Sequence, residues 1–268
     1  MSNFGKIIHD RPDPGLFRKR GITAVDMHFH SRYSDGVNKV RFILKKARQK
    51  GIGVCLTDHN VIRGSMIASR CKDVLTIPGI EVTAKEGCHI LFYFYSIREL
   101  ENFYYTNIKP KKAKTSPFLR ISAEEIIDRS RRYSCISIMA HPYAIAWTGM
   151  MNCVRNGVIR PEAAKKLDGI EAITGSNLRI PNKRSIELAL KMKGRMITGG
   201  SDGHIFYEMG HTLTFAKENI DNTRDFFEAV AKRRVFVVGK ETKFLKKHLA
   251  HSTKPTTRGM YALNYMGK

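Results

Sequence analysis

The sequence predicts an α/β protein with a parallel sheet, and three observations indicate this fold class. Short runs rich in β-branched residues alternate with amphipathic stretches at the spacing of βαβ units. Histidines and carboxylates gather at the ends of these runs, where a barrel of this class carries its active site. A chain of 268 residues can form one large domain, alone or with a small appendage.

The elements follow in order along the chain. The expected strands are the apolar runs at 22–29, 53–57, 75–82, 89–95, 134–140, 169–173 and 195–199. The expected helices are the amphipathic stretches at 40–50, 123–132, 161–166 and 182–193. Ser122 with Glu125 three residues later is a capping-box pattern, so a helix is expected to begin between them. Pro161 suits the first turn of the next helix.

Two basic segments stand apart from this pattern. Residues 109–120 hold five basic residues, two prolines and no acid, which is typical of a mobile loop. The tail 240–268 holds seven Lys or Arg and a single acid, Glu241, and we expect a partly ordered basic arm there.

The overall charge is strongly positive. Lys and Arg number 47 against 24 Asp and Glu, which gives a net charge of +23 and a pI near 10.0. Such a surface attracts polyanions, so phosphate-bearing substrates and nucleic acid are candidate partners. A charge set by solubility alone is the other interpretation.

The cysteine pattern and the hydropathy exclude several classes. Five cysteines without a Cys-x-x-Cys pair argue against a disulfide framework and against a thiolate zinc site, and we expect buried, reduced thiols. No apolar stretch reaches the roughly 18 residues that span a bilayer, and the N-terminus lacks a signal-peptide core. The sequence therefore predicts a cytoplasmic protein without a membrane partner.

The first expected strand ends in a pair of histidines. His28 and His30 are two residues apart, so in a strand they point to the same face and can bind one cation together. A lone buried histidine is usually a satisfied core residue. Two neighbouring imidazoles are harder to satisfy without a ligand.

Further side chains that can ligate a metal stand at the ends of the other strands, one or two per strand. They are His59, Glu81, His89, His141, Asp202 and His204. Six of the chain's ten histidines fall in this set or in the first pair, and the remaining four are expected at the surface or behind the site. The regular placement of these side chains predicts a metal centre at the carboxyl ends of the strands.

Imidazole and carboxylate donors without thiolates suit zinc, manganese or iron, and a carboxylate such as Glu81 can bridge two ions. In such a site one ion lowers the pKa of a bound water, and another polarises the phosphoryl oxygens. No nucleophilic side chain is then required. The sequence contains neither a Gly-x-Ser-x-Gly elbow nor a Gly-rich phosphate loop ending in Lys-Ser or Lys-Thr.

The order of the motifs resembles a known family. DMHFHSRYSDG, LTDHN, IPGIEVTA, CHILFYF, MAHPY and GGSDGH, in this order, are similar to the motifs of the PHP (polymerase and histidinol phosphatase) family. The match spans about 25–204, and the segment that follows resembles the C-terminal element associated with some members. The resemblance implies a distorted, TIM-like (β/α)7 barrel at 22–205, an associated element at 206–240 and a basic tail at 241–268.

The resemblance also implies up to three divalent ions (zinc, manganese or iron). Its ion sites would be formed by His28, His30, Asp202 and Glu81; by Asp35, His59 and His204; and by His89 and His141, with Glu81 bridging. Glu81, Asp202 and His204 are the residues expected to act in catalysis. Asp35, where some relatives carry His, resembles the nucleotide-phosphatase and exonuclease-like branch.

Two positions depart from the family pattern. Asn60 stands where many relatives have Asp, and Ala144 stands where Arg often follows the AHPY motif. A cation that binds the substrate phosphate must therefore come from elsewhere. The candidate substrate-binding residues are Arg32, Arg63, Asn177 and Arg179, although each arginine could equally be a solvated surface residue.

These observations favour hydrolysis of a phosphoester, in a small phosphorylated metabolite or a nucleotide, by metal-activated water. A nuclease that uses the two basic segments as an electrostatic track is the first alternative. A non-catalytic binding module is the second, and it is disfavoured because buried carboxylates are costly without a cation. The same ions would also serve amide hydrolysis.

Overall fold

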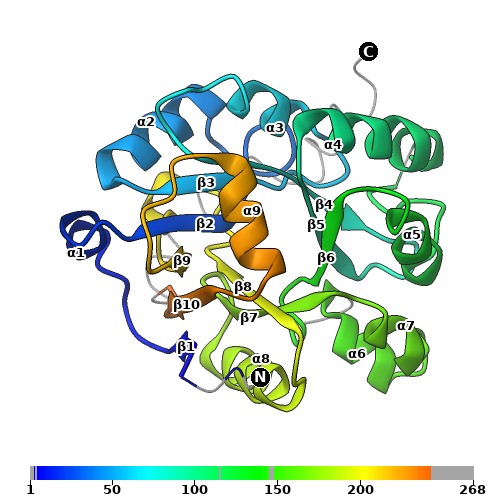
Figure 1. The fold of residues 1–268 in the computed structure, drawn as a ribbon. Helices are drawn as coiled ribbons and strands as arrows, with labels where there is room; N and C mark the ends of the chain where they lie inside the picture. The colour runs from blue at the N-terminus through cyan, green and yellow to red at the C-terminus, as the bar shows by residue number, and fades with distance from the viewer. Residues whose placement is uncertain (1–2, 4, 115, 145–147, 243–268) are drawn as a thin grey trace.

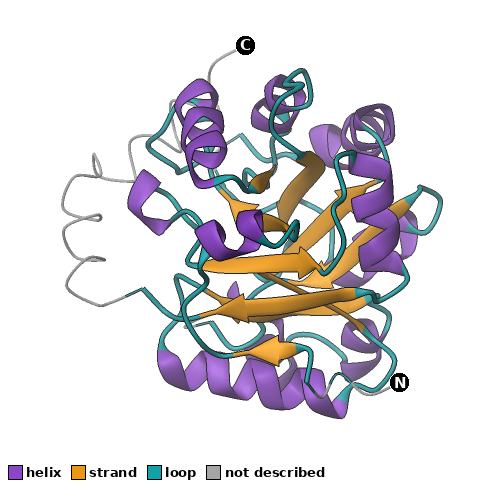
Figure 2. Ribbon diagram, turned by 60° about the vertical axis from the view of Figure 1, so that its left-hand side comes forward, coloured by secondary structure: helices purple, strands orange, loops and turns teal. Residues whose placement is uncertain are grey.

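The computed structural model describes residues 3, 5–114, 116–144 and 148–242. Its strands form one curled, mixed sheet, and helices surround that sheet (Figure 1). The sheet order is β1-β10-β9-β2-β3-β4-β5-β6-β7-β8. Figure 2 shows the strands from the side, enclosed by the helices. The expected α/β class and distorted barrel are confirmed.

The bounds of the elements are as follows. The strands are β1 (Ile7–Ile8), β2 (Thr23–Phe29), β3 (Gly53–Leu56), β4 (Thr76–Thr83), β5 (His89–Phe94), β6 (Cys135–Met139), β7 (Gly169–Thr174), β8 (Met196–Gly200), β9 (Thr212–Ala216) and β10 (Val235–Gly239). The helices are α1 (Pro14–Lys19), α2 (Val40–Lys50), α3 (Arg63–Ala68), α4 (Ile97–Phe103), α5 (Ala123–Ser130), α6 (Met150–Arg155), α7 (Pro161–Lys165), α8 (Arg179–Lys191) and α9 (Thr223–Ala231). Short helical turns cover η1 (Tyr104–Ile108), η2 (Lys109–Lys111) and η4 (Phe206–Glu208).

The expectation of a parallel sheet is wrong at the expected strand 89–95, which is β5, and the sheet also contains β9 and β10, which were not among the expected strands. Strand β5 runs antiparallel to both β4 and β6, and β9 runs antiparallel to β2 and β10. Only residues 84–88 join β4 to β5, and a connection this short forms a hairpin because it has no room for a crossover helix. The reversal places His89, the first residue of β5, opposite Thr83 at the carboxyl end of β4.

Glycines at the carboxyl end of β8 let this strand lie close to β2 and β10. A Cβ atom on Gly200 would lie 2.3 Å from the backbone nitrogen of His28, and one on Gly199 would lie 2.5 Å from Cγ1 of Val237. Close backbone approach of this kind requires glycine. Just beyond β8, the Asp202 N–H donates to the carbonyl of His28 at 2.7 Å.

The barrel interior is filled below the site and closed at its amino-terminal end. Met27, Leu91 and Tyr93 are at most 1% exposed and belong to the same apolar cluster as Phe226 and Val230 of α9. Helix α9 lies across the strands in Figure 1. Strands β9 and β10 extend the same sheet beyond β2. The domain boundaries expected from the sequence remain a prediction.

Several local features agree with the sequence expectations. Ser122 caps α5 by accepting a hydrogen bond from the Glu125 N–H, and Pro161 begins α7. All five cysteines are free, three of them buried. The described helices include none with the length and apolar character needed to cross a membrane.

In the basic segment 109–120, expected as a mobile loop, the described residues form hydrogen bonds with β4 and with one another. The Leu119 N–H donates to the carbonyl of Thr83 at 3.1 Å, and the Arg120 N–H donates to that of Lys111 at 2.8 Å. The segment therefore lies against the carboxyl end of β4. In the basic tail, 243–268 lie outside the described residues.

Candidate metal centre

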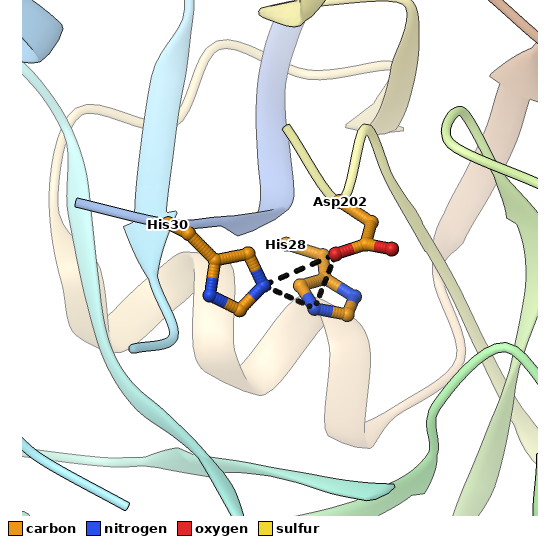
Figure 3. Close-up of side chains that lie close together, drawn as sticks. All are labelled: His28, His30 and Asp202. Carbon is orange, nitrogen blue, oxygen red and sulfur yellow. Dashed lines mark hydrogen bonds and ion pairs between the residues drawn. The ribbon is translucent and has the colours of Figure 1, made fainter. Parts of the chain in front are cut away.

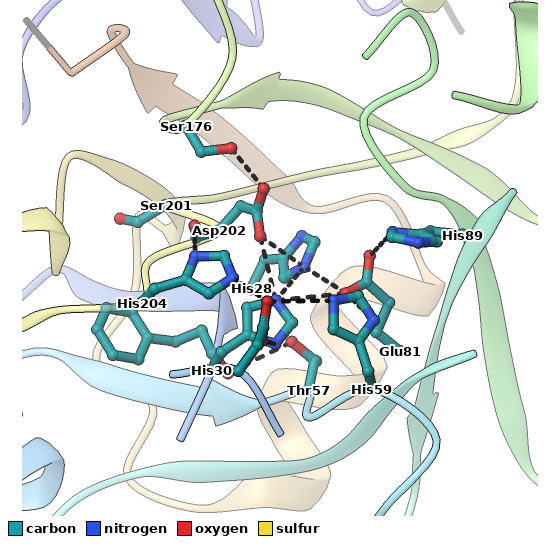
Figure 4. Close-up of polar contacts among 12 residues, drawn as sticks. His28, His30, Thr57, His59, Glu81, His89, Ser176, Ser201, Asp202 and His204 are labelled. Carbon is teal, nitrogen blue, oxygen red and sulfur yellow. Dashed lines mark hydrogen bonds and ion pairs between the residues drawn. The ribbon is translucent and has the colours of Figure 1, made fainter. Parts of the chain in front are cut away.

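Nine imidazole and carboxylate side chains converge at the carboxyl edge of the parallel strands, and Figure 4 labels all of them except Asp35 and His141. They come from β2 and the loop after it, from the loop after β3, from β4, from the start of β5, and from the turns after β6 and β8. They are His28, His30, Asp35, His59, Glu81, His89, His141, Asp202 and His204. The structure thus brings together all nine donors expected from the sequence.

The first group lies at the end of β2, and Figure 3 shows three of its members. Nε2 of His28 is 3.1 Å from Nε2 of His30 and 3.4 Å from Oδ1 of Asp202, which is 3.1 Å from the His30 nitrogen. Oε2 of Glu81 lies 3.3 Å from both imidazole nitrogens. Tetrahedral ligands about 2.05 Å from a zinc ion are about 3.3 Å apart, so these atoms have the spacing of a metal cage.

The second group uses the other oxygen of the same glutamate. Oε1 of Glu81 is 3.0 Å from Nδ1 of His89 and 3.1 Å from Nε2 of His141, and the two nitrogens are 3.3 Å apart. The two oxygens of Glu81 therefore face two different donor groups. This is the arrangement of a bridging carboxylate.

The third group is looser. Oδ2 of Asp35 is 2.8 Å from Nε2 of His204 and 3.9 Å from Nε2 of His59. The other nitrogen of His59, Nδ1, is 3.1 Å from Oε2 of Glu81. His59 thus lies between the first and third groups.

Some polar atoms of these nine side chains have no hydrogen-bond partner. His30 Nδ1, His141 Nδ1 and Glu81 Oε2 are buried without a hydrogen-bond partner. Unsatisfied buried polar atoms are rare because they cost free energy. Four overlapping triads in this cluster have atoms close enough together to hold a metal ion, so the residues present fit a divalent-metal centre.

The charges of the centre also favour a cation. Burial lowers the pKa of His30, but Asp35, Asp202 and Glu81 outweigh this effect and raise the pKa to about 9. Burial raises the pKa of Glu81, but the neighbouring imidazoles hold that pKa well below its usual range. The centre thus stabilises positive charge, which protons or metal ions can supply.

His59 behaves differently. Burial lowers its pKa to about 3, and the nearby carboxylates offset this only in part. A neutral imidazole is the form that ligates metal.

Three buried acids that sequence reasoning did not assign to the site hold the donors in place. Glu171 lies 3.0 Å from Nδ1 of His28, and its other oxygen accepts from the His141 N–H at 2.8 Å. Asp58 accepts from the Ser31 N–H at 2.7 Å, just after His30. The signal for these residues is a carboxylate inside or at the end of an apolar strand run, and such supporting groups orient metal ligands.

Asp26 is the third acid, and it fixes the turn that carries Asp202. Its carboxylate accepts from the N–H and the hydroxyl of Ser201 at 2.8 and 2.6 Å. Burial raises its pKa to about 6. Asp202 itself has a φ of 47°, and its Oδ2 accepts a hydrogen bond from the Ser176 hydroxyl. This left-handed backbone aims the carboxylate at the two histidines.

A pocket of about 430 Å³ opens above the donors. Its lining consists of Asp35, His59, Thr83, His89, Pro117, Phe118, His141, Ala144, Thr148, Ser176, Asn177, Leu178, Asp202 and His204. Of the expected substrate-binding residues, Asn177 belongs to this lining, whereas Arg32, Arg63 and Arg179 are exposed outside it. Among the described residues, the pocket is therefore lined without Lys or Arg, and substrate binding by the three arginines stays a prediction.

The fold and the site define a class: a distorted α/β barrel with buried histidine and carboxylate clusters at the carboxyl ends of its strands. The PHP domain model matches residues 26–190, and the PHP-associated model matches 179–235. The chain belongs to the PHP domain family.

Solved structures share the fold. A two-domain protein from Bacteroides vulgatus, containing a predicted PHP-like metal-dependent phosphoesterase, is 18% identical with a TM-score of 0.57, over 87% of this chain and 68% of that chain. The lesion-specific endonuclease PfuEndoQ from Pyrococcus furiosus is 16% identical with a TM-score of 0.60, over 92% and 72%. PsfC from Pseudomonas syringae is 15% identical with a TM-score of 0.60, over 91% and 99%. A comparison with curated proteins gives no match.

Proposed function

We propose that the chain hydrolyses phosphoesters of a small metabolite or a nucleotide, using divalent ions held by the nine donors. One observation carries the proposal: the two oxygens of Glu81 face two donor groups, each with the spacing of a metal cage. Paired ions that share a carboxylate are suited to phosphoryl chemistry, because they stabilise both the attacking and the leaving oxygen.

The residues would share the ions as the geometry groups them. His28, His30, Asp202 and Glu81 would hold one, and His89 and His141 would hold a second with Glu81 bridging. Asp35, His59 and His204 would hold a third. Zinc, manganese or iron fits these donors, and bound ions would supply Lewis acidity and lower the pKa of an attacking water.

The protein's own groups complete the reaction. The water oxygen bonds to phosphorus as the bond to the leaving alcohol breaks, and one water proton ends on that alcohol. Asp202 is suited to accept the proton first, since it lines the pocket and its Oδ2 is held by the Ser176 hydroxyl. In the metal-free chain, burial raises the pKa of Asp202, but the imidazoles of His28, His30 and His204 hold that pKa well below its usual range, so the carboxylate is ionised.

The experiment is metal analysis of the purified chain together with phosphate release from a panel of monoesters and nucleotides. Two or three ions per chain with phosphate release would support the proposal. A chain that carries its ions and hydrolyses none of the panel would contradict it.

A nuclease is the second candidate. Lys112 forms an isolated β-bridge with Leu119, the residue after the pocket residue Phe118, which places a positive charge of the basic segment near the pocket. The similarity to an endonuclease concerns the fold alone. Shortening of an oligonucleotide, with an affinity that falls steeply as salt rises, would favour this function over the first.

A further inference from the structure

The pocket has a polar floor and an apolar rim. The donors form the floor, and the rim contains Pro117, Phe118, Ala144 and Leu178. Phe118 and Leu178 are large apolar residues, yet they are 44% and 43% exposed. Apolar side chains held open to solvent at the mouth of a site are suited to contact an apolar part of the ligand.

Asn60 fixes one side of this rim. Its Nδ2 donates to the carbonyl of Pro117 at 2.8 Å, and its Oδ1 accepts from the Thr83 N–H at 3.0 Å. Its own N–H donates to the carbonyl of Glu81 at 2.9 Å. The φ of Asn60 is 52°, a left-handed conformation that Asn tolerates better than most residues. The rim is thus bonded directly to the strand that carries the bridging carboxylate.

An amide is required at this position for the whole arrangement. The carboxylate of an Asp would still accept from Thr83 but could not donate to Pro117. The departure of Asn60 from the family pattern therefore has a structural use in this chain: it attaches the segment that carries Phe118.

The polar groups of the rim set a further limit on the ligand. Lys and Arg are absent from the pocket lining in the described residues, so a second anionic group far from the floor would find no partner there. Nδ2 of Asn177 is buried without a hydrogen-bond partner, and it can donate to a neutral acceptor. A volume of about 430 Å³ leaves room for much more than a phosphoryl group.

We propose that Phe118 and Leu178 bind the leaving group, and that the preferred substrate is a phosphomonoester whose alcohol carries an uncharged aromatic ring. This inference rests on the proposed function, since it assigns the phosphoryl group to the floor. Stacking of a ring on an aromatic side chain supplies the selectivity.

Two matched pairs of substrates test the proposal. Adenosine 5′-monophosphate and ribose 5-phosphate share the same phosphorylated sugar carbon and differ in the base, and benzyl and ethyl phosphate differ in the ring. We expect kcat/KM to be about tenfold or more higher for the ring-bearing member of each pair, the usual size of one stacking contact.

Single substitutions test which residues cause the preference for ring-bearing substrates. Phe118→Ala should reduce the ratio of kcat/KM within each pair towards one, whereas Phe118→Tyr should preserve it. Asn60→Asp should reduce the ratio in the same direction without loss of bound metal. Phe42→Ala removes another exposed aromatic ring, 41% exposed and outside the pocket lining, and should leave the ratio unchanged.

The outcomes separate the two proposals. Equal kcat/KM within both pairs, from an enzyme that hydrolyses all four esters, would overturn the leaving-group site and leave the phosphoesterase intact. Retention of the full ratio by Phe118→Ala would overturn the leaving-group site as well. Metal-loaded protein that hydrolyses no ester of any kind would remove the proposed function, and this inference with it.

Discussion

The floor and the rim of the pocket are built in different ways. The floor consists of side chains at strand ends, and buried acids such as Glu171 and Asp26 hold the strands and turns that carry them. The rim consists of residues from three connecting segments, and one side of it is attached through a hydrogen bond between residues 57 positions apart, Asn60 and Pro117. The difference implies that the proposed chemistry would depend on the sheet, whereas the proposed choice of substrate would depend on loops that can change without disturbing the sheet.

The largest effect should come from the centre of the floor. Glu81→Gln keeps the size of the side chain but removes its charge and one of the oxygens that face the donor groups. We expect loss of bound metal and a fall in kcat/KM of about a thousandfold or more, since several kcal/mol of charge stabilisation is lost. Metal content and phosphate release measure this. Glu187→Gln, an exposed acid on α8, is the matched control.

The next largest effect, on metal affinity, should come from a buried acid that supports the ligands of the floor. Glu171→Gln can still accept from the His141 N–H but cannot serve both histidines as a carboxylate does. Loss of such a supporting group lowers metal affinity by about 10- to 100-fold. Titration with a competing chelator measures the affinity. An unchanged affinity would mean that the floor does not depend on its supporting acids, and the contrast with the rim would then be lost.

The floor should also respond to pH in a way that the rim does not. In the metal-free protein the pKa of His30 is raised to about 9 and that of His28 is raised well above its usual value. A raised folded-state pKa contributes stability below the unfolded value near 6.5, and that stability is lost as pH rises through the folded value. The melting temperature of the metal-free chain should therefore fall between pH 6.5 and 9.

Metal loading should reverse this trend. Bound ions replace the protons, so binding strengthens as pH rises. Thermal denaturation with and without metal compares the two states. Parallel pH profiles for both forms would argue against ions at His28 and His30.

The smallest effect should come from charges outside the pocket. Arg179 begins α8, one residue after Leu178, and is exposed. If it only attracts the substrate, Arg179→Ala should lower kcat/KM by roughly two- to threefold at low salt, and the difference should disappear at high salt. A larger loss that persists at high salt would indicate a direct contact with phosphate, as the sequence predicted.

The donors were predictable because their information is local. His28 and His30 share a face through the period of a strand, and Glu81, His141 and Asp202 each follow or end an apolar run. The direction of each strand, in contrast, is not encoded in the residues of the strand itself. The reversal of β5 depends on a short hairpin. Because of this reversal His89, although it is the first residue of its strand, lies at the edge of the sheet that carries the other donors.

The rim was beyond prediction for a related reason. Phe118 lies in a segment that appeared to be a mobile basic loop, and its position depends on a bond to a residue far away in the sequence. The sequence favours the three arginines because they stand next to motifs along the chain, whereas the pocket lining brings together residues from separate loops. Helices such as α3 and α6, each of six residues, were missed because they are too short to show a helical period.

The closure of the barrel by α9 has a consequence for the order in which products would leave. Phe226 and Val230 close the amino-terminal end of the barrel, and Met27 and Tyr93 fill the space beneath the donors. In the proposed reaction, substrate and products would then enter and leave through the pocket, the opening that the described residues leave above the donors. With the phosphoryl group on the floor, as proposed, the alcohol would leave first and inorganic phosphate last, so free phosphate should compete with substrate while the alcohol should not.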